Sequence, residues 1–213
     1  MSKLFEIYYF EEEPQVSGDE EKQVCSWLEN NLQNFDAVIV PDYGNGMLTQ
    51  PMIEVICRAS PFLAINTQVN SGNRGYHVVT RYSKANFVCL NEPELWLATH
   101  NRHDSSEVLA REILSTLDAE YISITKGAKG LFSIHKDNDE PLYIPPLASK
   151  VIDRVGAGDA FLSLVSICLA SGLPLSASSF IGAAAAALEV QIVGNSRTIE
   201  KAALLQYMSV LLK

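Results

Sequence analysis

Apolar and polar positions follow one another along the chain in blocks whose periods predict strands and helices in turn. Residues 4–10 are rich in Phe, Ile and Tyr with a partial period of two, which predicts a strand. Residues 19–32 carry apolar side chains at helical spacing, and residues 36–40 form the short apolar run that is typical of a strand buried on both faces of a parallel sheet. The first forty residues therefore predict strand, helix and strand.

The same alternation continues through the middle of the chain. Strands that alternate with helices imply right-handed crossovers and a mostly parallel sheet with helices on both faces. Residues 131–135 and 142–144 predict an antiparallel hairpin added to that sheet, and residues 158–213 predict helices. Neither a repeat nor a linker interrupts this order, so we expect residues 1–213 to form one α/β domain. The remaining strands are predicted at residues 62–65, 87–90 and 121–125, and the remaining helices at residues 50–58, 92–98 and 105–117.

Composition and charge restrict the class of protein. A chain of 213 residues with 47% apolar and 19% charged residues can bury a full core. The formal net charge of −9 argues against nucleic acid as a partner, because nucleic-acid binders need clustered Lys and Arg. The start of the chain lacks a signal-peptide pattern, and the apolar stretch 160–193 is divided into pieces too short to span a bilayer. Four scattered cysteines fit buried, reduced thiols, so we expect a cytoplasmic protein without membrane contact.

The most informative segment joins two glycines and an alanine to the start of an apolar helix. Gly156, Ala157 and Gly158 allow backbone N–H groups to converge at the positive end of that helix, which would make an anion hole for phosphate oxygens. Asp159 follows in the first turn, where a carboxylate can accept the proton of a hydroxyl that attacks a phosphoryl group. Taken alone, the segment also fits a glycine turn followed by a helix that Asp159 caps.

Residues 153–159 read Asp-Arg-Val-Gly-Ala-Gly-Asp and closely resemble the C-terminal signature of the ribokinase (PfkB) family of carbohydrate kinases. The resemblance implies that Asp159 is the catalytic base and that the backbone of the three residues before it holds the charge on the transferred phosphoryl group. It also implies that Asp153 belongs to the nucleotide site. Arg154 stands where the family usually has Thr, and the sequence leaves open whether it faces solvent or the phosphates.

Two further loops resemble nucleotide-site motifs of the same family. Thr125, Gly127 and Gly130 fit its Thr-x-Gly-x-x-Gly loop, in which glycines let the backbone approach the ATP phosphates. Asn91 and Glu94 fit its Asn-x-x-Glu motif, which implies that Glu94 helps to order Mg²⁺ and phosphate through water. A β-turn and a helix cap are the plain alternatives, and for the second motif both interpretations stay open.

Two other segments are similar to parts of the family that contact the substrates. Residues 42–46 read Asp-Tyr-Gly-Asn-Gly and resemble a stretch of the heptose-phosphate kinase branch that has Lys in place of Asn45. Loss of that cation weakens the inference of a phosphorylated sugar. The alanine-rich helix ahead of Gly194 resembles the wall of the adenine pocket, which would assign Ala183 and Gly194 to the nucleotide site.

The resemblance implies a ribokinase-like three-layer αβα sandwich with a mostly parallel sheet. It further implies a kinase that uses ATP and Mg²⁺, leaves room for a monovalent cation, and transfers phosphate to the hydroxyl of a sugar or sugar phosphate. The expected partners are the nucleotide and the sugar substrate. The alternative is a non-catalytic nucleotide-binding module of a larger protein.

The resemblance begins late in the family's pattern, since the N-terminal part and most of the lid have no counterpart here. Residues 1–213 are therefore expected to be a kinase fragment that is inactive alone, with residues 1–12 as a remnant of the lid or of an edge strand. Contacts with a second copy, or with other domains of a longer chain, stay open.

Overall fold

The computed structural model describes residues 16–69, 76–194 and 196–213. In these ranges a single sheet follows the strand order β1-β2-β3-β4-β5-β6. The first four strands are parallel, and β5 and β6 are antiparallel additions, as the sequence predicted. The strands span Val38–Asp42 (β1), Leu63–Thr67 (β2), Phe87–Asn91 (β3), Tyr121–Thr125 (β4), Leu131–His135 (β5) and Leu142–Ile144 (β6).

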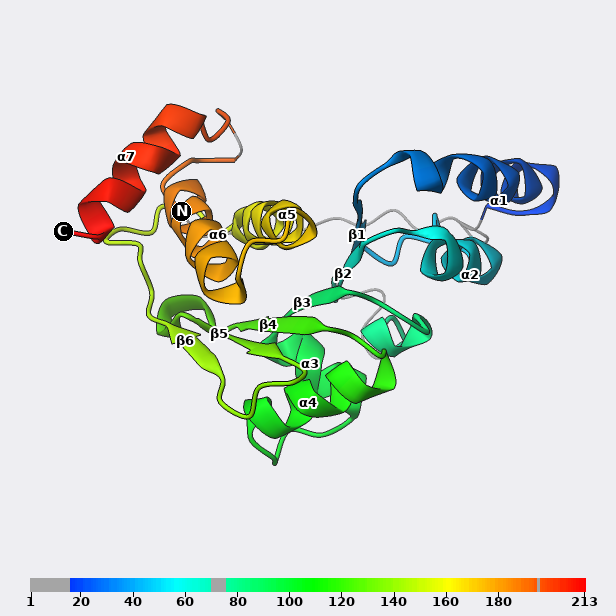
Figure 1. The fold of residues 1–213 in the computed structure, drawn as a ribbon, viewed down its shortest axis with the longest axis horizontal. Coiled ribbons are helices and arrows are strands. Elements are labelled where there is room, and N and C mark those ends of the chain that lie inside the picture. The colour runs from blue at the N-terminus through cyan, green and yellow to red at the C-terminus, as the bar shows by residue number, and fades with distance from the viewer. Residues whose placement is uncertain (1–15, 70–75, 195) are drawn as a thin grey trace.

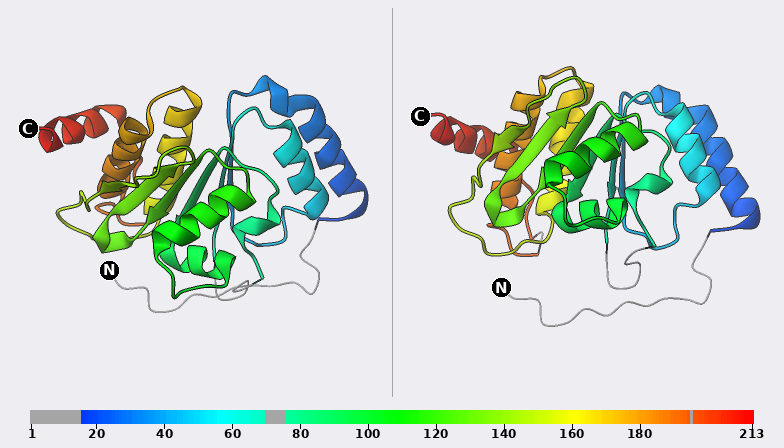
Figure 2. Two further views of the ribbon diagram at one scale, coloured as in Figure 1. Left: turned by 60° about the horizontal axis from the view of Figure 1, so that its bottom comes forward. Right: turned by 90° about the horizontal axis from the view of Figure 1, so that it is seen from below.

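Helices cover both faces of this sheet and make three layers, which confirms the expected αβα sandwich (Figure 1). The layer of α2, α3 and α4 lies on one face, with α1 packed outside α2, and α5 and α6 cover the other face (Figure 2). No helix of the described ranges is both long and apolar enough to cross a membrane. The helices are α1 (Gly18–Asn31), α2 (Gln50–Ala59), α3 (Glu92–Thr99), α4 (Ser106–Thr116), α5 (Ala157–Ala170), α6 (Leu175–Glu189) and α7 (Lys201–Leu211), with 3₁₀ turns η1 (Leu32–Asn34), η2 (Val79–Arg81) and η3 (Gly127–Lys129).

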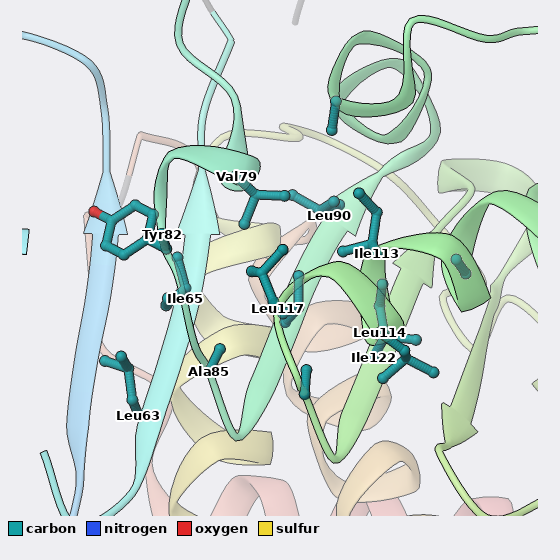
Figure 3. Packing of buried hydrophobic residues seen from close by; sticks show 14 of the residues in the cluster. Leu63, Ile65, Val79, Tyr82, Ala85, Leu90, Ile113, Leu114, Leu117 and Ile122 are labelled. Atoms are coloured by element: carbon teal, nitrogen blue, oxygen red, sulfur yellow. The ribbon is translucent and has the colours of Figure 1, made fainter. Parts of the chain in front are cut away.

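Successive residues of the central strands enter different halves of the core. Ile65 of β2 packs in the cluster on the α2, α3 and α4 side, whereas its neighbour Ala64 packs in the cluster beneath α5 and α6. Figure 3 shows the first cluster, where Leu90 of β3 meets Ile113 and Leu117 of the α4 region. Because both faces are buried, the strands read as continuous apolar runs rather than as alternating ones.

Helix α6 approaches α5 and the sheet closely because small residues line it. A Cβ on Gly182 would collide with the Val165 side chain of α5. Toward the sheet, the hydroxyl of Ser179 lies 2.9 Å from that of Ser133 on β5, which lies 2.7 Å from that of Ser123 on β4. These buried hydroxyls satisfy one another where α6 crosses the strands, and so fix its position over the sheet.

The ends of the first strands differ from the expected ones. The strand predicted at residues 36–40 spans Val38–Asp42, and the one predicted at residues 62–65 extends to Thr67. The apolar signal stops before the polar ends of these strands, but the parallel ladder continues to the pair Asp42 and Thr67. The expected strand at residues 4–10 and the remnant at residues 1–12 lie outside the described residues.

The apolar stripe of α1 is less buried than its helical spacing suggests. Trp27 is 54% exposed, whereas Leu32, just after the helix, is 4% exposed. Cys25 of α1 and Cys168 of α5 are half-buried, so the expectation of four buried thiols was wrong for these two. In the described ranges α1 contacts chiefly α2 and η1. The apolar side chains of α1 that do not face these two elements, such as Trp27, therefore stay exposed.

Candidate active site

The carboxyl ends of three parallel strands bring predicted site residues to one edge of the sheet. Strand β1 ends at Asp42, β3 at Asn91 and β4 at Thr125, and Asn91 is directly paired with Thr125 in the ladder. Helix α5 begins near this edge with Ala157 and contacts β1 and β2. In open α/β sheets, ligands bind outside the carboxyl ends of the strands.

A cavity of about 360 Å³ opens between the nucleotide-type loop, the start of α5 and the inner face of α6. Its lining includes six of the residues singled out from the sequence. One part is lined by Thr125 and the glycines of the loop after β4, and the other by apolar residues between positions 145 and 151 and by alanines of α6. The six are Thr125, Gly127, Gly130, Ala157, Gly158 and Ala183.

The two glycines of the loop after β4 have different structural roles. Gly130 has a φ of 83°, and a Cβ there would collide with the carbonyl oxygen of Ile144 and with Pro145. Gly127 has a φ of 56° but open space around its Cβ position. Gly130 therefore allows the loop to pass close to the end of β6, while Gly127 leaves backbone exposed to the cavity.

The start of α5 is built as an open helix N-terminus. Gly156 is the N-cap residue, with a φ of 86°, and the structure has no side-chain hydrogen bond from this cap. A Cβ on Gly158 would meet nothing within 4 Å. The N–H groups of this first turn consequently face the site without a protein cap, which suits an anion. Asp159 is the third helical residue and does not occupy the cap position that the plain alternative gave it.

Tyr43 lies in the loop after β1 and is 40% exposed. Burial, and then the charge of Asp159 at the start of α5, raises the pKa of Tyr43 above its ordinary value, so its hydroxyl is neutral at neutral pH. Sequence reasoning noticed residues 42–46 but did not place them near α5, because nothing local in the two segments indicates that β1 and α5 meet.

Asp153 ties the glycine turn to the end of α6. Its Oδ1 accepts from the N–H of Val155 at 3.2 Å, and its Oδ2 accepts from the N–H of Gly194 at 3.0 Å. These two backbone hydrogen bonds lower the pKa of Asp153. The backbone N–H groups of Ile152 and Asp153 also donate to the carbonyl of Val190, at 2.7 and 3.1 Å. The predicted residues Asp153 and Gly194 thus form a clasp beside the cavity.

Asn91 and Glu94 form a complete capping box at the start of α3. The Asn91 side chain accepts from the N–H of Glu94 at 2.9 Å, and the Glu94 carboxylate accepts from the N–H of Asn91 at 2.9 Å. Glu94 is 5% exposed and also accepts from the Asn66 amide at 3.3 Å. Burial raises the pKa of Glu94 despite these donors. The described residues contain no group of three or more His, Cys, Asp or Glu side chains that could hold a metal ion directly.

Asp42 lies in a buried polar cluster that the sequence did not reveal. Its carboxylate accepts from the Tyr82 hydroxyl at 2.7 Å and from the Gly44 N–H at 3.1 Å, and lies 3.1 Å from Nε2 of His77. Arg81 reaches the same carboxylate at 3.8 Å and Nδ1 of His77 at 2.9 Å. Burial opposes the charged form, but the hydrogen bonds from His77 and Tyr82 outweigh it and lower the pKa of Asp42.

The two departures from the family pattern lie in different places. Arg154 is exposed and lines the cavity beside Ala157 and Gly158, so it faces both solvent and the site. Asn45 is exposed in the loop after β1. The two interpretations of Arg154, facing solvent or facing the site, therefore do not exclude each other.

Comparison with known proteins identifies relatives over nearly the whole chain. Residues 19–202 match the model of the pfkB family carbohydrate kinases. The bifunctional protein HldE of Trichlorobacter lovleyi is 31% identical over 184 residues, which cover 85% of this chain and 37% of that protein. The HldE protein of Shewanella sediminis is 31% identical over 212 residues, covering 99% of this chain and 43% of that protein. The chain therefore spans less than half the length of these relatives.

Solved structures agree with the fold. Phosphofructokinase-2 from Escherichia coli, in complex with potassium, superposes with a TM-score of 0.76 at 15% identity, covering 93% of this chain and 64% of the other. Ribokinase from Thermotoga maritima superposes with a TM-score of 0.70 at 18% identity, covering 85% and 59%. The fold is that of the ribokinase-like kinases.

Proposed function

Because the chain belongs to the pfkB family of carbohydrate kinases, we propose that it forms the nucleotide-binding and catalytic part of an ATP-dependent kinase. Its acceptor would be a hydroxyl of a sugar or sugar phosphate. The observation that carries this proposal is the juxtaposition of an uncapped α5 N-terminus, the carboxylate of Asp159 and the cavity beside them.

The cavity suits a nucleotide in its volume and in having an apolar part beside a polar part. Its apolar part, between residues 145–151 and α6, can hold a base by packing. Its polar part holds Thr125 and the backbone of Gly127 and Gly158, which suit phosphate oxygens. In this placement the last phosphate lies nearest the start of α5, where Asp159 is located.

The residues at the start of α5 have separate proposed roles in proton acceptance and in charge stabilisation. The Asp159 carboxylate is placed to take the proton of the attacking hydroxyl, and the N–H groups of Ala157 and Gly158 are placed to hold the charge that develops on the phosphoryl oxygens. Gly156 allows the turn that exposes those N–H groups. The clasp between Asp153 and Gly194 keeps this turn against the end of α6.

Glu94 is the proposed partner of Mg²⁺ through water. A bound Mg²⁺ would neutralise charge on the phosphates, and it usually keeps several of its waters, so one carboxylate suffices. Glu94 follows β3, is only 5% exposed and already accepts hydrogen bonds from Asn91 and Asn66, which suits an outer role better than direct coordination. The described part of the chain also contains no group of three side chains that could hold a metal ion. A monovalent cation is a further ligand to test, since the phosphofructokinase-2 neighbour is described with potassium.

We propose a heptose phosphate as the acceptor. The resemblance of residues 42–46 to the heptose-phosphate kinase branch supports this choice, as does the similarity to proteins named HldE. Asn45 lacks the positive charge of that branch, so an anionic group of the acceptor would need a cation from elsewhere. Fructose 6-phosphate and ribose, which occur in solved neighbours, are the comparison acceptors.

We also propose that residues 1–213 are one kinase domain fragment of a longer protein. The share of the relatives that the chain spans, 37% and 43%, supports this proposal. We expect the complete protein to supply further acceptor-binding elements. Its proposed cytoplasmic location and any contact between copies can be measured directly on the complete protein.

The decisive test replaces Asp159 by Asn in the complete protein. Asp159→Asn is expected to lower phosphate transfer to the heptose phosphate by about 10² to 10⁴, because Asn keeps the shape but cannot accept the proton. ADP affinity, measured by calorimetry with Mg²⁺, should stay close to that of the parent, because backbone N–H groups hold the phosphates.

Asp137→Asn is the matched control, since Asp137 lies on an exposed turn and loses the same charge. Transfer by the Asp159→Asn variant at nearly the parent rate would contradict the assignment of the base. ADP binding by the parent without transfer to any of the three acceptors would favour the non-catalytic module instead.

A further inference from the structure

We infer that the buried cluster of Asp42, His77, Arg81 and Tyr82 is a positioning unit that holds the loop after β1 in the conformation that receives the acceptor. The inference rests on the proposed function and deepens it, because it assigns residues outside the nucleotide cavity to the handling of the acceptor. The loop joins the carboxyl end of β1 to α2, at the edge of the sheet where open α/β folds bind their ligands.

The Asp42 carboxylate is surrounded by donors of the protein itself. Its Oδ1 accepts from the Gly44 N–H at 3.1 Å and lies 3.1 Å from Nε2 of His77. Its Oδ2 accepts from the Tyr82 hydroxyl at 2.7 Å and lies 3.8 Å from Arg81. A carboxylate has about four lone-pair positions, and these groups fill them. Asp42 therefore acts on the loop rather than by binding a sugar hydroxyl directly.

His77 connects the carboxylate to Arg81 in one defined direction. A guanidinium can only donate, so Nδ1 of His77 accepts from Arg81 at 2.9 Å and the ring proton is on Nε2. That Nε2–H faces the Asp42 carboxylate and also lies 3.2 Å from the backbone carbonyl of Asp42. A buried network whose donors and acceptors all match has a single arrangement, which makes it a rigid base for what it carries.

The cluster holds the loop near both of its ends. At the start, the Gly44 N–H is bound to the Asp42 carboxylate and Gly44 has a φ of 68°. Near the other end, the Arg81 guanidinium donates to the Leu48 carbonyl at 3.3 Å. Asp42, His77 and Tyr82 are at most 5% exposed, and the Tyr82 ring packs in the core (Figure 3).

The loop between these anchors presents its side chains outward. Tyr43 is 40% exposed and Met47 is 74% exposed. Helix α5, whose first turn carries Asp159, contacts β1, so the loop lies on the side of the site that the proposed base serves. None of the four cluster residues lines the nucleotide cavity. Loosening the cluster should therefore affect the acceptor and leave the nucleotide in place.

The test is Tyr82→Phe in the complete protein, with ATP, Mg²⁺ and a heptose phosphate, assayed well below the melting temperature of the variant. Phe keeps the ring in the core and removes the donor to Asp42. The value of kcat/KM for the acceptor should fall by about 10- to 100-fold, the effect of a small misplacement at a reacting site, while KM for ATP and the affinity for ADP stay unchanged. Deuterium exchange should become faster in residues 43–48 but not in residues 126–130.

Tyr143→Phe is the matched control, because its hydroxyl also donates to a carboxylate, 3.1 Å from Glu107, but at an exposed position of β6. It should change neither the kinetics nor the exchange of residues 43–48. An unchanged kcat/KM for the acceptor in Tyr82→Phe, even with a lower melting temperature, would reduce the cluster to a structural role and overturn the inference. So would an equal rise of KM for ATP.

Asp42→Asn gives a second comparison. The amide nitrogen turns one accepting position into a donor that faces other donors, so this variant should show the same selective loss toward the acceptor. Because both changes act on one network, Tyr82→Phe should lower kcat/KM little further on the Asp42→Asn background, and fully multiplicative losses would contradict a single positioning unit. If the parent transfers phosphate to none of the three acceptors, the proposed function fails and this role fails with it. An active parent with unaffected variants would refute the positioning role alone.

Discussion

At the scale of single residues, Glu94 has a structural role that is visible in α3 and a proposed chemical role at Mg²⁺. Its carboxylate completes the capping box of α3, which any Glu or Gln at this position could do. Burial nevertheless raises its pKa, so the folded state disfavours the charged form of this carboxylate. An amide at this position would also cap the helix, so capping and the proposed role at Mg²⁺ can be tested separately.

Glu94→Gln separates these two tasks. The variant is expected to need roughly 10 to 100 times more Mg²⁺ for half-maximal activity, the usual effect of losing an outer-sphere partner of a metal. Because the pKa of Glu94 is raised from 4.5 in the folded state, its contribution to the free energy of unfolding is present below that pH and is lost as the pH rises. The variant should lack this loss, which urea unfolding between pH 4 and pH 8 would measure.

Glu112→Gln, on the exposed side of α4, is the matched control for the change in charge. An unchanged Mg²⁺ requirement in Glu94→Gln would leave capping as the whole role of Glu94.

At the scale of elements, the site depends on how closely the loop between β4 and β5 approaches its neighbours. The Lys126 N–H donates to the Gly130 carbonyl at 2.8 Å, which closes the loop around η3. Lys126 also pairs with Glu92 of α3 at 3.2 Å and lies over the Phe132 ring at 4.9 Å. The loop is thereby fixed to α3 and β5, and its glycines decide how near it comes to β6 and the cavity.

Gly130→Ala and Gly127→Ala form a matched pair in this loop. Gly130→Ala should lower the free energy of unfolding by about 3 kcal/mol, because its Cβ would collide with the backbone of Ile144 and Pro145 in a conformation that favours glycine. Gly127→Ala should cost about 1 kcal/mol, the ordinary cost of a left-handed residue in open space. Denaturant unfolding of both variants measures the difference, and equal losses would contradict the close approach at Gly130.

At the scale of the whole molecule, the sheet of the described ranges has β1 as one edge strand and β6 as the other. The antiparallel hairpin of β5 and β6 forms one end of the sheet. At the other end β1 pairs only with β2 and contains Pro41, a residue that central strands exclude but edge strands tolerate. The partly exposed face of α1, with Trp27, lies on the same side. The cavity lies toward the end formed by β5 and β6, and the loop after β1, which carries Tyr43 and is the proposed acceptor side, lies toward the other end.

This division predicts different behaviour for the two substrates. Residues 1–213 alone should bind ADP with Mg²⁺, because the cavity and the α5 N-terminus lie within them. They should not transfer phosphate to sugars, because the acceptor would lack the positioning that supplies most of the rate. Calorimetry with ADP and a transfer assay on the heptose phosphate measure both, with the complete protein as the control. Turnover by residues 1–213 alone, or no heat with millimolar ADP, would contradict this prediction.

What the sequence alone determined is local. Periodicity fixed the type and order of the elements from α1 onward, and glycines next to Thr125 and Asp159 marked the loops of the site, because both signals act within a few residues. The tertiary structure alone decided which distant groups meet. Asp153 and Gly194 are 41 positions apart, and Asp42 and Tyr82 are 40 apart. Such contacts depend on how the helices and loops pack across the sheet, which no local pattern in the sequence records.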